Sequence, residues 1–94
     1  MLLFADNTAG GLAETRHTVR QLQAAAKQGG NAPLLVMTDQ EGGEVKRLAG
    51  APMLAPEEMG SDATARSQGG AAGELLRFVG VNVDLAPVAD VERV

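Results

Sequence analysis

The hydrophobic positions of the chain form short continuous runs that are separated by stretches of helical periodicity. An unbroken apolar or β-branched run covers Leu34–Thr38. This pattern is typical of a strand that is buried on both faces, as in a parallel sheet. Shorter apolar stretches at Met1–Ala5 and Val81–Val88 predict two further strands. Pro87 should lie at the end of the last strand or at a bulge, because proline cannot donate a hydrogen bond to a ladder.

Two helices are predicted between these strands. The first covers Leu12–Gln28 and ends at Gly29 and Gly30. The second begins after Ser61 or Asp62, either of which can cap it, and runs to Val79. The apolar face of the first helix consists of Leu12, Val19, Leu22 and Ala26, and that of the second of Ala65, Ala72, Leu75, Leu76 and Val79. Pro56–Met59 can add one short helical turn.

The order strand, helix, strand, helix, strand predicts an α/β fold of about three βα units with a parallel sheet. Right-handed crossovers place the carboxyl ends of such strands on one side. An acidic residue follows each predicted strand, and these residues are Asp6, Asp39 with Glu41, and Asp90. We expect them to share one face, at the edge where parallel α/β folds bind their ligands.

Composition excludes several classes of function. The 94 residues form one small domain or a piece of a larger one, and 45% of them are hydrophobic, as in a globular protein. The net charge is −4 and the basic residues are scattered, so no nucleic-acid partner is expected. The chain has no Cys, which excludes disulfides and leaves the compartment undecided. Met1–Ala5 is too short to span a membrane, and it begins almost inside a strand, so we expect that Met1 is not the natural start.

The polar residues after the strands fit a metal or phosphate site poorly. Asp39 and Glu41 supply two carboxylates, but nothing near them completes a six-oxygen shell, and we predict no metal. The loop Asp6–Gly11 precedes a helix but lacks the spacings of known phosphate-binding loops, and we predict no cofactor. His17 lies among polar residues in a helix and has no ligand partner at metal spacing.

Asp39 and Arg47 together fit a polyol or sugar site. A carboxylate accepts hydrogen bonds from hydroxyl groups, and a guanidinium group donates several in a fixed fork. The eight-residue separation contains Gly42 and Gly43, which let the chain fold back and bring Arg47 beside Asp39. The simpler alternative is that Asp39 only shapes a turn and that Arg47 is a surface charge.

Four segments of the sequence resemble glycoside hydrolase family 3, in order and over essentially the whole chain. They are Leu3-Phe4 with Asn7, Thr38–Gly43 with Val45 and Arg47, Glu74–Leu76, and Gly80–Val91. The form Asp-Gln-Glu-Gly-Gly at Asp39–Gly43 resembles the β-N-acetylhexosaminidase branch of that family. The resemblance implies a TIM-like (β/α)₈ barrel, which takes about 250 residues when complete. Residues 1–94 would then be a fragment of the N-terminal barrel domain that contains about three βα units.

The resemblance also implies a function and assigns two residues. The enzyme would hydrolyse terminal β-N-acetylhexosaminyl or related β-glycosyl residues by a retaining mechanism, with a carbohydrate as its partner. Asp39 and Arg47 match positions that bind sugar hydroxyls in the family. The nucleophile segment and the His–Asp acid/base motif are missing, so no catalytic residue is assigned and the isolated chain is predicted to be inactive. Asp84 and Asp90 match motif positions and are expected to shape the strand end. The alternative is a small, non-catalytic α/β binding module.

Overall fold

Three short parallel strands form the central sheet in the computed structural model of the protein, which describes residues 1–90. The strands are β1 (Leu2–Leu3), β2 (Met37–Thr38) and β5 (Val83–Asp84), in the spatial order β1-β2-β5. Thr38 is in register with Leu3 on one side and with Asp84 on the other. The strands therefore run in parallel with β2 in the middle, and the α/β class predicted from the sequence is confirmed.

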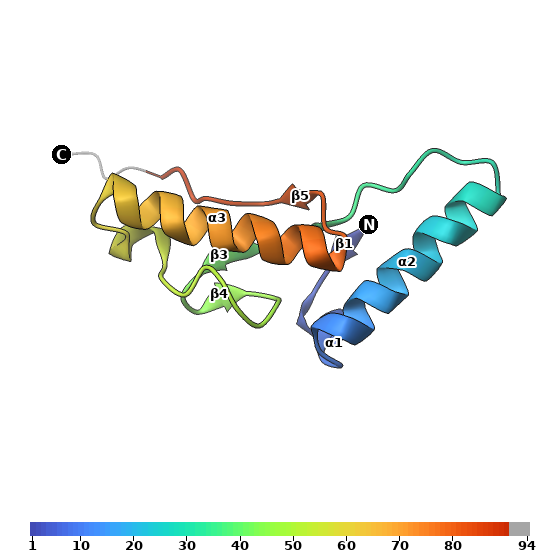
Figure 1. Ribbon diagram of the computed structural model, residues 1–94, viewed down its shortest axis with the longest axis horizontal. Helices are drawn as coiled ribbons and strands as arrows, with labels where there is room; N and C mark the ends of the chain where they lie inside the picture. The colour runs from blue at the N-terminus through green and yellow to red at the C-terminus, as the bar shows by residue number, and fades with distance from the viewer. Residues whose placement is uncertain (91–94) are drawn as a thin grey trace.

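Two long helices connect the strands. Helix α2 (Leu12–Gln28) and helix α3 (Asp62–Val79) have the bounds that the hydrophobic periodicity predicts. The Ser61 hydroxyl caps α3 by accepting the N–H of Thr64 at 3.1 Å, and Gly80 ends it with a left-handed φ of 95°. Figure 1 shows α3 lying along the sheet while α2 slants away from it, which gives the molecule an elongated shape of 51 × 25 × 23 Å.

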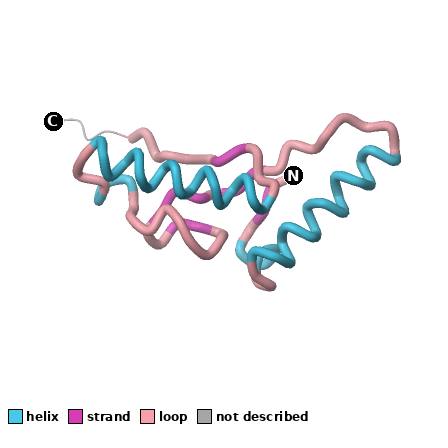
Figure 2. Tube along the Cα trace, viewed as in Figure 1, coloured by secondary structure: helices cyan, strands magenta, loops and turns pink. Residues whose placement is uncertain are grey.

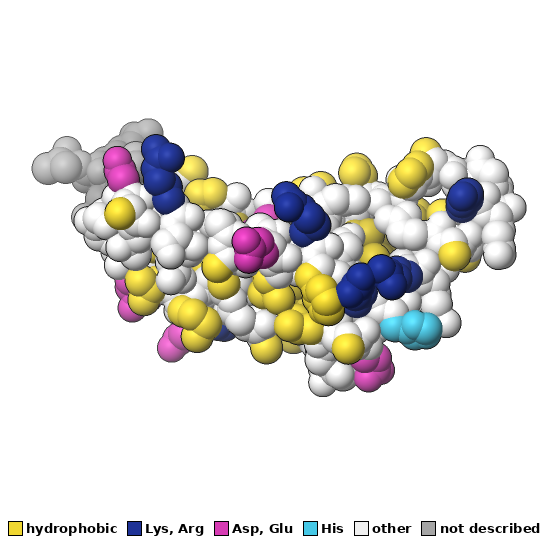
Figure 3. Space-filling view, in the orientation of Figure 1, with side chains coloured by type: hydrophobic (Ala, Val, Ile, Leu, Met, Phe, Trp, Pro, Cys, Tyr) yellow, Lys and Arg dark blue, Asp and Glu magenta, His cyan; other side chains and the backbone are white. Residues whose placement is uncertain are grey.

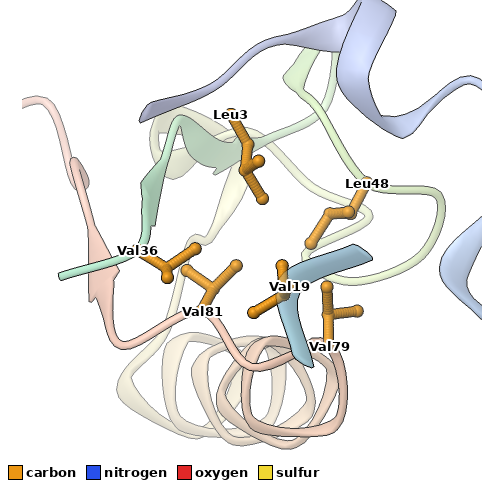
Figure 4. Close-up of a cluster of buried hydrophobic side chains, with 6 residues drawn as sticks. All are labelled: Leu3, Val19, Val36, Leu48, Val79 and Val81. Carbon is orange, nitrogen blue, oxygen red and sulfur yellow. The ribbon is translucent and has the colours of Figure 1, made fainter. Parts of the chain in front are cut away.

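A small aliphatic core joins the two helices to the sheet. Its buried side chains are Leu3, Val19, Val36, Leu48, Val79 and Val81. Figure 4 shows them converging from β1, from both helices, from the segment before β2, from the loop after β4 and from the segment between α3 and β5. Burial of one such side chain contributes about 1.5–3 kcal/mol to the free energy of unfolding, so this cluster helps to hold both helices against the rest of the fold.

The strands are shorter than the sequence predicts, as the tube drawing in Figure 2 shows. The reason is that side chains take over hydrogen bonds that a longer ladder would have made. The amide of Gln23 bonds to both the N–H and the C=O of Leu34, at 2.8 and 3.0 Å. The side-chain oxygen of Asn82 accepts the N–H of Val36 at 2.9 Å. The peptide groups before β2 are therefore satisfied without regular strand pairing.

The prediction that Leu34–Thr38 is buried on both faces is wrong. Val36 and Thr38 are fully buried, whereas Leu35 is 61% exposed. Leu35 lies before β2 and outside the regular strand. Leu22 and Ala65 of the predicted helix faces are also exposed. Figure 3 shows hydrophobic side chains at the surface near the middle of the molecule, below α3.

The segments around the sheet contain four short elements, two helical turns and two strands. Asp6 lies in a one-turn helix α1 (Ala5–Thr8), where the sequence predicts a loop. The predicted turn near Pro56 is present as the 3₁₀ helix η1 (Pro56–Glu58). Strands β3 (Gln40–Gly42) and β4 (Val45–Lys46) form an antiparallel hairpin directly after β2, which the sequence analysis does not predict. This hairpin determines the geometry of the site.

Candidate functional site

Asp39 lies at the carboxyl end of the middle strand, immediately after Thr38 of β2. Its carboxylate oxygen Oδ2 is 3.3 Å from Nη2 of Arg47, which forms an ion pair with it. The Asp39 side chain is 25% exposed and that of Arg47 is 30% exposed. The fold-back of Arg47 that the sequence predicts is therefore present, and the pair remains accessible at the ligand-binding edge of a parallel sheet.

The β3–β4 hairpin returns the chain so that Arg47 reaches Asp39. Gln40 pairs with Lys46 and Gly42 with Val45, with a register shift between them. The turn requires glycine, because Gly42 has a φ of 116° and Gly43 a φ of 58°. At Gly42 there is also no room for a side chain, since a Cβ atom would lie 2.1 Å from the carbonyl oxygen of Leu54. Two glycines thus set the position of Arg47 relative to Asp39.

Gln40 is the residue that the sequence analysis missed. It lies between two acidic neighbours in the sequence, yet it is 1% exposed and its side chain is fully hydrogen-bonded. The side-chain oxygen accepts the N–H groups of Arg47 and Leu48, at 3.1 and 3.0 Å. The side-chain nitrogen donates to the carbonyl oxygens of Leu48 and Ala51, at 3.0 and 2.8 Å. No pattern of hydrophobic spacing could have found it, because a single buried amide leaves no periodic signal.

Arg47 is held mainly through its main chain. Its carbonyl oxygen accepts a hydrogen bond from the Thr8 hydroxyl at 2.5 Å, and its N–H is bound by Gln40. The guanidinium group, by contrast, contacts only Asp39, and its buried Nε has no hydrogen-bond partner in the part of the chain that the structure describes. The Nη donors that do not bind Asp39 are therefore left for another partner at this edge of the sheet, whereas the buried Nε is closed to a ligand.

Asp84, on the neighbouring strand β5, completes the acidic side of the site. Its Oδ1 accepts the main-chain N–H of Gln40 at 2.9 Å, which ties the end of β5 to the start of the hairpin. Burial raises the pKa of the Asp84 carboxyl, the hydrogen bond from Gln40 lowers it, and the negative charge of Asp39 raises it further, with a net rise above the ordinary 3.8. Asp84 therefore shapes the strand end, as the sequence predicts.

The raised pKa of Asp84 gives a testable pH dependence. Between pH 3.8 and the native pKa the folded state binds more protons than the unfolded state, so stability falls as the pH rises through this window. Asp84→Asn keeps the acceptor oxygen for Gln40 and removes the charge. The quantity to compare is the melting temperature of Asp84→Asn minus that of the wild type, measured at one pH. We expect this difference to be larger at pH 7 than at pH 3.5. A difference that is equal at both pH values, or reversed, would contradict this assignment.

The other acidic and titratable candidates do not join the pair. Asp6 and Asp90 are exposed, and so is His17 on α2. Glu41 is half-buried on β3 and lines two hollows of about 580 and 340 Å³. Neither of these two hollows is lined by Asp39 or Arg47. Within residues 1–90, no group of three or more His, Cys, Asp or Glu side chains is placed to hold a metal ion.

The arrangement is suited to binding a neutral polyhydroxyl ligand. The Asp39 carboxylate can accept hydrogen bonds from hydroxyl groups, and the free guanidinium donors of Arg47 can donate to their oxygens. Binding of a negatively charged ligand would be disfavoured by the charge of Asp39 and by that of Asp84 when it is ionised. Figure 3 shows Lys and Arg side chains spread over the face that it draws.

Comparison with known proteins assigns the chain to a family. Residues 1–94 match the family described as "Glycosyl hydrolase family 3 N terminal domain". The chain is 32% identical over 97 residues to an "Uncharacterized secreted glycosyl hydrolase" of Arthroderma benhamiae. That alignment covers 99% of this chain and 28% of the relative, so the chain spans just over a quarter of the relative's length. No solved structure matches the chain. Among residues 1–90, no helix is long and apolar enough to cross a membrane. With a family match over its full length, the chain belongs to glycosyl hydrolase family 3, in the N-terminal domain of that family.

Proposed function

We propose that residues 1–94 are the first part of a (β/α)₈ barrel domain in which Asp39 and Arg47 bind hydroxyl groups of the sugar that is cleaved. The observation that carries the proposal is the accessible ion pair between these residues at the carboxyl edge of a parallel sheet. The parallel strand order β1-β2-β5, with a long helix between consecutive strands, supports the barrel. The protein with its whole barrel domain is called the complete enzyme below.

The proposed reaction is the retaining hydrolysis of terminal β-N-acetylhexosaminyl residues. A retaining enzyme needs an acid and a nucleophile about 5–5.5 Å apart on the two sides of the scissile bond. Asp39 and Glu41 are two residues apart at one strand end, and Asp39 is already paired with Arg47, so they do not supply this arrangement. The catalytic groups therefore come from other parts of the complete enzyme, and the present residues orient the ring. The Asp-Gln-Glu-Gly-Gly sequence supports the choice of the N-acetylated sugar.

A comparison of two proteins and two substrates tests the proposal. We expect the complete enzyme to release the aryl group from an aryl β-N-acetylglucosaminide faster than from the matching β-glucoside. The purified 94-residue chain should release it from neither substrate, because it lacks both catalytic groups. Turnover by the isolated chain would contradict the proposed division of roles. A preference of the complete enzyme for the glucoside would exclude the N-acetylhexosaminidase assignment and keep the glycosidase assignment.

A further inference from the structure

The side chain of Gln40 connects the two halves of the proposed sugar site. Gln40 follows Asp39 directly in the sequence, and its side-chain oxygen accepts the N–H of Arg47 at 3.1 Å. The same oxygen accepts the N–H of Leu48 at 3.0 Å, so two consecutive peptide groups are fixed against one amide. The side-chain nitrogen makes two more hydrogen bonds, to Leu48 and Ala51, which exhaust the bonding capacity of the amide.

The position of the Arg47 guanidinium depends on this main-chain anchor. Within the described residues the guanidinium makes one hydrogen bond, from Nη2 to Oδ2 of Asp39, and it is 3.3 Å long, whereas charge-assisted hydrogen bonds are usually about 2.7–2.9 Å. The Nε atom has no hydrogen-bond partner in the described part of the chain. Because the side chain is held weakly at its tip, its direction is set by where the peptide of Arg47 lies. That peptide is bound by Gln40 on its N–H side and by Thr8 on its C=O side.

We propose that Gln40 is a positioning residue for substrate binding, which acts by fixing the main chain of Arg47 and so aiming its guanidinium at the sugar. The inference rests on the proposed function and extends it to a residue that does not touch the substrate. At 1% exposure Gln40 is closed to a ligand, so its effect passes through Arg47. The alternative is that Gln40 stabilises the hairpin without any influence on binding.

A double-mutant cycle in the complete enzyme tests the proposal. Gln40→Met keeps the length of the side chain and removes all four of its hydrogen bonds. We expect a loss in kcat/KM of roughly 10–100-fold, the range that a shift of about 1 Å in a positioning group can cause. In an Arg47→Ala background the same replacement should cost less than about twofold, because the group that Gln40 aims is absent. An equal loss in both backgrounds would overturn the proposal.

Gln23 provides a matched control. It is also a glutamine whose amide bonds to the N–H and the C=O of one residue, Leu34, and it lies on α2 away from the pair. Gln23→Met should lower the melting temperature while kcat/KM, measured well below that temperature, stays within about twofold of the wild type. If Gln23→Met lowers kcat/KM as strongly as Gln40→Met, the effect is one of general stability and the positioning role is wrong.

A second variant keeps the test decisive if Gln40→Met does not fold. Gln40→Glu retains the oxygen that faces the N–H groups of Arg47 and Leu48. When the glutamate is ionised, however, its second oxygen faces the carbonyl groups of Leu48 and Ala51 and has no proton to donate to them. Burial and these carbonyl groups favour its protonated form, which restores a donor. We therefore expect kcat/KM of Gln40→Glu, relative to the wild type, to rise as the pH falls. A ratio that does not change with pH would overturn the proposal.

The outcomes separate this inference from the proposed function. If Arg47→Ala leaves kcat/KM unchanged, the sugar-binding role of Arg47 is wrong and the proposed function fails at that residue. If Arg47→Ala lowers kcat/KM while folded Gln40→Met does not, the sugar site stands and only the positioning role of Gln40 is rejected.

Discussion

Asp39→Ala is expected to lower kcat/KM of the complete enzyme by roughly 10–150-fold. The variant removes a carboxylate that accepts hydrogen bonds from the substrate, and a hydrogen bond to a charged group contributes about 1.5–3 kcal/mol. At 1.36 kcal/mol per tenfold change this energy corresponds to the stated range. The covalent glycosyl-enzyme should still form, because Asp39 orients the sugar and does not attack it. Steady-state kinetics and trapping of the intermediate with a slow substrate measure the two effects.

Arg47→Ala should reduce kcat/KM by a similar factor, and the double variant should lose less than the product of the two single losses. The reason is that the two side chains contact each other at 3.3 Å and are proposed to hold one ring, so their contributions are coupled. Glu14→Ala, which removes an exposed carboxylate on α2, is the control for a change of charge alone.

Thermal melts must show that these variants remain folded, since Asp39 also lies at the start of the hairpin. Unchanged kinetics in folded Asp39→Ala would leave this residue with the simpler role of shaping the turn. Complete loss of the glycosyl-enzyme in a folded variant would mean that Asp39 takes part in the chemical step, which the present proposal denies.

Gly42→Ala is expected to lower the free energy of unfolding more than the addition of a methyl group at any other position of the hairpin. Residue 42 has a φ of 116°, which costs an L-residue about 1–3 kcal/mol. The added Cβ would lie 2.1 Å from the carbonyl oxygen of Leu54 and 3.0 Å from the Pro52 Cβ, and overpacking of this kind costs about another 1–3 kcal/mol. The nearest atom belongs to the main chain, so it cannot yield by a side-chain rotation. Denaturant unfolding should show the loss, and kcat/KM should fall with it because the hairpin carries Arg47.

Gly70→Ala is the matched control for this variant. Gly70 lies within α3, and a Cβ there would meet no heavy atom within 4 Å apart from its chain neighbours and the backbone of the helix itself. Alanine is favoured over glycine inside a helix by about 0.8–1 kcal/mol, so Gly70→Ala should raise the free energy of unfolding by up to that amount. The account of the hairpin would be wrong if Gly42→Ala were as stable as the wild type, or if the two variants changed stability in the same direction.

The two long helices and the location of the middle strand could be predicted from the sequence because they depend on neighbouring residues. Helix α3 needs only its 3.6-residue periodicity, a serine at its start and a glycine at its end, all within about 20 residues. Asp39 was found for the same reason, because the end of an apolar run marks the end of a strand. The fold-back of Arg47 also followed from a local feature, the pair of glycines between them.

The length and exposure of the strands depended on contacts that no local pattern encodes. The run Leu34–Thr38 has the composition of a strand buried on both sides, but no element within residues 1–90 covers Leu35, which is exposed. Its pairing is interrupted by Gln23 and Asn82, whose side chains bind the main chain from 11 and 46 residues away. A polar residue in a sequence does not indicate which distant peptide group it will satisfy.

The sequence by itself thus determined the two long helices, their alternation with the three parallel strands and the fold-back of Arg47 toward Asp39, since short-range periodicity, capping and turn chemistry govern them. Only the tertiary structure decided how this pair is held. The burial of Gln40, its four bonds to the returning hairpin and the raised pKa of Asp84 all arise where segments distant in the sequence meet. Desolvation and hydrogen-bond geometry depend on that meeting, because the same glutamine or aspartate in an unfolded chain would be hydrated like any other.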